Sequence, residues 1–160
     1  MDKFGEQVDI LVSAGVPVEC TMYDFSAYYL LFPRAAEEQW FCEETVSSAG
    51  PHVAHRCQFG FRELPHLLNR FAYVVLQLIE RKLQYEQAVF PIDQVPASVQ
   101  QWMADRAERG LSINWWAAMG FFDDSSLASF EFFADTVRRV ATDMWAQYNM
   151  TIEESKTHMH

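Results

Sequence analysis

Apolar residues that recur at steps of three and four constrain the fold of this chain more than any other feature. In residues 64–84 the repeat is formed by Leu64, Leu67, Leu68, Phe71, Val75, Leu78 and Ile79. Charged and amide side chains fill the positions between them, which is the pattern of a helix with one buried face. A second block of this kind, over residues 127–148, is formed by Leu127, Phe130, Phe133, Val137, Val140, Ala141, Met144, Trp145 and Tyr148. The sequence therefore predicts two long amphipathic helices.

Turn-forming residues divide the rest of the chain into shorter blocks that also fit helices. We expect helices over residues 4–14, 21–32, 34–47, 97–109 and 112–119, with Gly15 and Gly110 placed to end the first and the fourth. Residues 50–62 show no period and predict a loop. No segment alternates apolar and polar residues for long, although short strands could form within residues 8–20 and 86–95.

Together these blocks predict a mainly α fold. The chain has 160 residues, half of them hydrophobic, which suits one domain with a substantial core. We expect a single-domain irregular helical bundle of about six or seven helices, with room for one short β-hairpin. Residues 1–150 would form this single helical domain, and residues 151–160 a polar flexible tail.

The charge of the chain narrows the choice of partners. With 22 acidic and 12 basic residues, the formal net charge is −10. Residues 1–50 hold nine acidic residues against Lys3 and Arg34, a net charge of −7. This charge disfavours nucleic acid and anionic membranes as partners. It favours electrostatically steered encounter with a basic protein.

The helix expected over residues 34–47 is the strongest candidate for a partner-binding surface. It carries Glu37, Glu38, Trp40, Phe41, Glu43 and Glu44. Aromatic side chains supply contact area that loses its water on binding, and carboxylates steer and pair with lysine or arginine. The same helix could instead turn Trp40 and Phe41 toward the core and leave the four glutamates in water.

The sequence offers weak evidence for metal binding or catalysis. His52, His55 and Cys57, with Cys42 or His66 as a further ligand, are of the types that zinc prefers, but no second cluster of paired ligands accompanies them. Three loosely spaced cysteines indicate reduced thiols, and a cysteine beside a histidine is no more than a residue-type match for a nucleophile. Phosphate-loop, dinucleotide and hydrolase signatures are missing from the sequence. We therefore expect no metal, no cofactor and no enzymatic activity.

Two functional hypotheses follow, both non-catalytic. The first is an acidic protein-binding module that acts as a stoichiometric inhibitor or immunity-type neutraliser of a basic, nuclease-like protein. The alternative is a helical sensor or carrier that binds a small apolar ligand in a pocket lined by Trp115, Trp116, Met119, Phe121 and Phe122. The charged N-terminus fits no signal or transit peptide, and the longest apolar stretch, residues 71–79, is too short for a bilayer. We expect a cytoplasmic protein.

Overall fold

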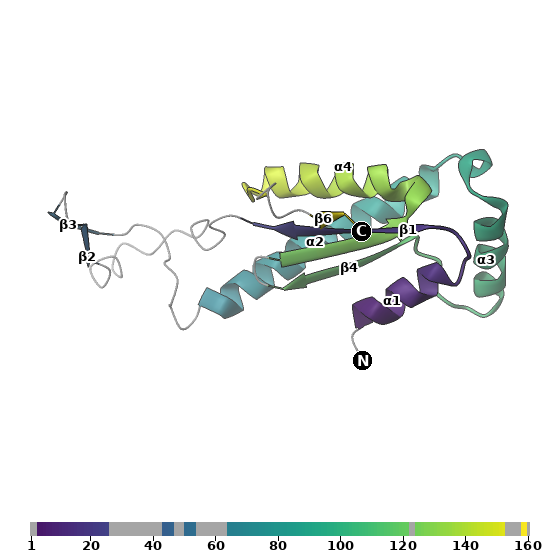
Figure 1. Ribbon diagram of the computed structural model, residues 1–160, viewed down its shortest axis with the longest axis horizontal. Helices are drawn as coiled ribbons and strands as arrows, with labels where there is room; N and C mark the ends of the chain where they lie inside the picture. The colour runs from purple at the N-terminus through teal and green to yellow at the C-terminus, as the bar shows by residue number, and fades with distance from the viewer. Residues whose placement is uncertain are drawn as a thin grey trace.

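The computed structural model describes residues 3–25, 43–46, 50–53, 64–121, 124–152 and 158–159, and this part of the chain is a mixed α/β fold (Figure 1). Its four α-helices are α1 (Lys3–Val12), α2 (Leu64–Val89), α3 (Ala97–Glu108) and α4 (Glu131–Gln147), and a short 3-10 helix, η3 (Ile92–Gln94), precedes α3. The prediction of a mainly α bundle of six or seven helices is wrong, because a β-sheet lies at the centre of the molecule.

The sheet is antiparallel and has the order β4-β5-β1-β6. Its strands are β1 (Val18–Asp24), β4 (Trp116–Phe121), β5 (Asp124–Phe130) and β6 (His158–Met159). Thr21 of β1 stands opposite Leu127 of β5, and Ser129 of β5 opposite Trp116 of β4. A separate two-stranded hairpin joins β2 (Glu43–Val46) to β3 (Gly50–Val53).

Helices cover both faces of the sheet. Tyr23 of β1 packs against Trp145, so α4 lies on the face of the sheet to which the Tyr23 side chain points. Residues opposite one another in an antiparallel pair have their side chains on the same face. Helices α2 and α4 contact each other on this face, where α2 also contacts β4. Helix α1 contacts β4 and β5 from the other side (Figure 1). As a result, Ser125 to Phe130 of β5 are all buried.

Burial on both faces explains why the strands were mistaken for helices. A strand covered on both sides reads as a continuous run of apolar and small residues instead of an alternating one. Residues 21–24, 116–119 and 127–130 were predicted as helix but lie in β1, β4 and β5. Leu127 and Phe130 are three residues apart and so continue the stripe of α4 by coincidence. Residues 43–46, predicted as helix, and residues 50–53, predicted as loop, form the hairpin.

The predicted helices at residues 4–14, 64–84 and 97–109 are confirmed by α1, α2 and α3. Leu68, Val75 and Ile79 of the predicted apolar stripe are buried in α2, whereas Leu67 is 45% exposed. Gly110 has a φ of 65°, the left-handed conformation that ends α3 and that glycine adopts without steric cost. The second long block is a helix from residue 131 onward.

Parts of the segment predicted as a polar tail are described. Ile152 forms a β-bridge with Phe25, and His158–Met159 pairs with Met22 and Thr21 of β1. The flexibility of residues 151–160 as a whole, and the domain boundary at residue 150, stay predictions.

Candidate functional site

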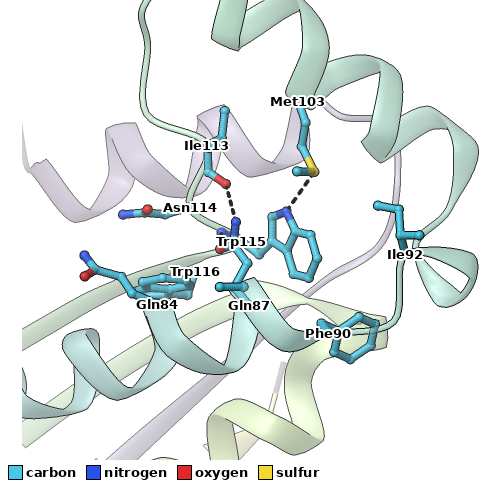
Figure 2. A pocket seen from close by; sticks show the side chains of 10 residues that line it. Gln84, Gln87, Phe90, Ile92, Met103, Ile113, Asn114, Trp115 and Trp116 are labelled. Carbon is cyan, nitrogen blue, oxygen red and sulfur yellow. Dashed lines mark hydrogen bonds between the residues drawn. The ribbon is translucent and has the colours of Figure 1, made fainter.

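A hollow of about 410 Å³ opens where the C-terminal half of α2 meets the segment that leads into β4 (Figure 2). We call it the hollow. It is lined by Gln84, Gln87, Ala88, Phe90, Ile92, Met103, Ile113, Asn114, Trp115 and Trp116. These residues come from α2 and the residue after it, η3, α3, the irregular segment at residues 113–115 and the start of β4, so several separate elements form its walls.

Gln87 holds two of these walls together. Its Nε2 donates a hydrogen bond to the Ile113 carbonyl at 3.0 Å, and its Oε1 accepts one from the Trp115 backbone N–H at 3.1 Å. One side chain of α2 therefore pairs with a backbone carbonyl and a backbone N–H of the irregular segment at residues 113–115. Because unpaired backbone groups are costly when buried, these two bonds fix residues 113–115 against the helix.

The indole of Trp115 forms the inner wall. Its ring packs edge to face against Phe90 at a centroid distance of 5.6 Å and against Phe133 at 5.3 Å. The indole N–H points toward Met103 Sδ, 3.2 Å away (Figure 2). Trp115 is thus fixed by the core on one side while it borders the hollow on the other.

The chemistry of the walls is apolar and uncharged. Aromatic and aliphatic side chains form the interior, Ile92 is 60% exposed at the rim, and Gln84 and Asn114 present exposed amides. Of the described residues that line the hollow, none has a side chain that ionises near neutral pH. The site can take an apolar group and offer it amide hydrogen bonds, and the lining residues that the structure describes supply no general acid, base or nucleophile.

The aromatic pocket proposed from the sequence coincides with the hollow only in part. Trp115 and Trp116 line it. Met119 does not, because it stands opposite Ser126 in the register, on the sheet face away from α2, and is 36% exposed. The side chain of Phe121 and the whole of Phe122 lie outside the described residues.

The predicted partner-binding residues lie mostly outside the described part of the chain. Glu37, Glu38, Trp40 and Phe41 are not described, whereas Glu43 and Glu44 lie in β2, opposite Val53 and His52. The helix expected through residue 47 is therefore wrong at its C-terminal end. On a strand, successive side chains point to opposite faces, so Glu43 and Glu44 cannot share one surface.

The metal and cysteine hypotheses are covered only in part. His52 lies in β3, while Cys42, His55 and Cys57 are outside the described residues. Within those residues, no group of three or more His, Cys, Asp and Glu side chains could hold a metal ion. Cys20 is half-buried, and burial raises the pKa of its thiol, which disfavours the reactive thiolate.

Sequence reasoning missed the residues that shape the hollow most. Gln84 and Gln87 lie on the polar side of α2, where amides are ordinary, and no local signal distinguishes them. The excess of aromatic residues near residue 115 was the one usable signal.

In comparisons with known proteins, no protein-family model matches the chain, and no curated protein matches it significantly. None of the helices in the described residues combines the length and apolar character needed to cross a membrane.

Proposed function

We propose that the protein is a non-catalytic binding protein and that the hollow receives an uncharged, mainly apolar group of its ligand. The observation that carries this proposal is an opening of about 410 Å³ with aromatic and aliphatic walls, an amide rim and, among the described residues that line it, no ionisable side chain. That volume is within the range of small-ligand sites, roughly 300–1,000 Å³.

The walls are built before any ligand arrives. The two hydrogen bonds of Gln87 and the packing of Trp115 fix the irregular segment that would otherwise have to be ordered on binding. A preorganised site loses less conformational entropy when it binds, so more of the contact energy appears as affinity.

Binding can be measured with 4-fluorotoluene by fluorine NMR, with 4-fluorobenzoate as a probe of the same ring that adds a carboxylate. We expect the apolar probe to bind and the anion to bind more weakly, because none of the described residues that line the hollow is basic. Ala88→Phe should block the site, since Ala88 lines it from an exposed position of α2.

The matched control is Ala146→Phe, which places the same side chain at an exposed position of α4. Loss of probe binding in the first variant and retention in the second supports the proposal. Equal binding by both variants, or no binding by the unaltered protein, contradicts it.

A second proposal rests on the acidic N-terminal region, with its net charge of −7 over residues 1–50. This charge supports binding of a basic protein, with inhibition of a nuclease-like partner as the expected consequence. Steered association weakens with salt, so complex formation should fall steeply as ionic strength rises. If Trp40 is the anchor of that surface, Trp40→Ala should raise the dissociation constant by an amount equivalent to about 2 kcal/mol or more.

We further propose a cytoplasmic location. Support comes from the odd number of cysteines, together with the free thiol of Cys20 among the described residues.

A further inference from the structure

The sheet has an open edge at β4, which has β5 as its one strand neighbour among the described residues (Figure 1). The Phe130 N–H donates to the Trp115 carbonyl at 3.3 Å, so Trp115 and every second residue after it turn their backbone groups toward β5. The backbone N–H and C=O groups of the alternate residues, Trp116, Ala118 and Gly120, therefore point away from the sheet. Within the described part of the chain, no backbone hydrogen bond reaches these outward groups. We call this side of the strand the open edge of β4.

The open edge begins at the hollow and can be reached from solvent. Trp116 lines the hollow at one end of β4. Farther along, Ala118 is half-buried and Gly120 is exposed. Exposed edges of this kind accept an added strand, whose backbone supplies the missing hydrogen bonds.

Helix α2 lies alongside β4 and runs in the opposite direction. A β-carbon built on Gly120 would lie 3.6 Å from Leu76 Cδ2, whereas Gln84 borders the hollow together with Trp116. Residues four apart lie on the same side of a helix, so Glu80 stands between Leu76 and Gln84. A segment following the open edge from the hollow would therefore pass Glu80 next.

Glu80 is suited to receive a positive charge. Its side chain is half-buried, its carboxylate accepts a hydrogen bond from Gln77 Nε2 at 2.8 Å, and burial raises the pKa of its carboxyl group. A cation beside it would offset this loss of solvation. Arg81 and Lys82 are turned roughly 100° and 200° around the helix from Glu80, so they point to other sides.

Building on the proposed function, we infer that the group entering the hollow is an apolar side chain of an extended, basic segment of a partner protein. The segment adds a strand to the open edge of β4 and places a lysine or arginine against Glu80. A second copy of the chain is a poorer occupant, because each copy carries a net charge of −10.

The spacing of the two recognised residues follows from backbone geometry. Four residues of a helix rise about 6 Å, which separates Glu80 from Gln84 along α2. Two residues of a strand rise about 6.7 Å and return to the same face. The segment should therefore carry its basic residue two positions from the apolar residue.

The test begins with a selection of displayed random peptides, roughly eight residues long, against the immobilised full-length chain. We expect the enriched peptides to share a large apolar residue with lysine or arginine two positions away. Failure to enrich peptides, or enrichment of peptides without this spacing, overturns the inference.

Strand addition is tested with N-methylated forms of a selected peptide. Methylation at positions whose N–H faces β4 should weaken binding by about tenfold or more, because a backbone hydrogen bond is lost and a methyl group blocks the edge. Methylation at the alternate positions should have a much smaller effect. Equal losses at both sets of positions would rule out pairing with the strand.

The charge contact is tested with Glu80→Gln, and Asp143→Asn on the exposed side of α4 is the matched control. Each variant removes one negative charge, so general electrostatic steering changes equally. We expect Glu80→Gln to weaken peptide binding by about two- to fivefold at low salt, and Asp143→Asn to leave it unchanged. Equal effects of the two variants contradict the placement of the basic residue.

Failure of this inference is distinguishable from failure of the proposed function. If 4-fluorotoluene binds the hollow while no peptide is selected, the hollow is a binding site but strand addition is wrong. If neither binds, both proposals are wrong.

Discussion

Trp145 and Trp115 are buried to nearly the same extent, with 1% and 2% of their surfaces exposed, but they belong to regions that are built differently. Trp145 projects from α4 and packs edge to face against Tyr23 at 4.4 Å and Phe25 at 5.1 Å. Trp145 and Tyr23 belong to a regular helix and a regular strand, and Phe25 follows that strand directly, in a β-bridge to Ile152. All three rings are buried, so this region is closed. Trp115 stands in an irregular segment that Gln87 attaches to α2.

The difference shows how a binding site can arise beside a core. Regular elements bring aromatic rings together over their whole length, as in the region of Trp145. An irregular segment follows the neighbouring helix less closely and leaves space, so one face of Trp115 packs in the core while another borders the hollow. If the two regions differ in this way, substitutions in them should have different consequences for stability and for binding.

The largest effect is expected in the closed region. Trp145→Ala removes a ring that is 1% exposed and leaves a cavity among regular elements that cannot collapse into it. We expect a loss of about 3–5 kcal/mol in the free energy of unfolding, measured by urea denaturation. The folded fraction should still bind 4-fluorotoluene. A loss below about 1 kcal/mol would show that this region is not closed.

A smaller effect is expected where the irregular segment is attached. Gln87→Leu leaves the Ile113 carbonyl and the Trp115 N–H without their partner, so the free energy of unfolding should fall by about 2 kcal/mol. Probe binding should fall as well, because residues 113–115 lose their fixed position.

Gln84→Leu, three residues earlier on the same helix, is the matched control for this change. Gln84 also lines the hollow and is exposed, so its replacement should alter stability by no more than about 0.5 kcal/mol. Similar losses in the two variants would contradict the role given to Gln87.

The last expected effect, absent at neutral pH, concerns the pH dependence of the closed region. Burial raises the pKa of Tyr23 to about 12, and the side-chain hydrogen bond with Thr21 lowers this pKa by a smaller amount. The folded state therefore keeps this phenol neutral above pH 10, near which an unfolded chain loses the proton. Its contribution to stability is complete below about pH 10 and is lost as the pH rises to about 12.

Tyr23→Phe lacks this titration. The stability of the unaltered protein should therefore fall more steeply than that of the variant over this pH range, as followed by urea midpoints. Parallel curves for the two proteins would show that burial of Tyr23 does not govern the titration.

The helices of this fold could be predicted because each buries one face. Val75, Ile79 and Leu83 of α2 repeat at the helical period and are all buried. The strands could not be predicted in the same way. Strand β5 has helices on both faces, so Leu127 on one face and Ala128 and Phe130 on the other are all buried, and the alternation that identifies a strand is lost.

The candidate site was predictable only through its aromatic residues. The excess of aromatics near Trp115 and Trp116 suggested a pocket, and both residues line the hollow. Met119 was assigned to the same pocket by assuming a helix, and its strand conformation turns it to the other face. The role of Gln87 depends on a contact with residues 26 and 28 positions away in the sequence, which no local pattern indicates.

One NMR measurement can test whether the hollow is a binding site and the region of Trp145 is closed. The chain has five tryptophans, so its indole N–H signals can be assigned with single Trp→Phe variants. On titration with 4-fluorotoluene, the signals of Trp115 and Trp116 should shift with a common dissociation constant, and the signal of Trp145 should stay in place. Shifts of Trp145 equal to those of Trp115, or no shift of Trp115 and Trp116, would show that the hollow does not bind the probe as proposed.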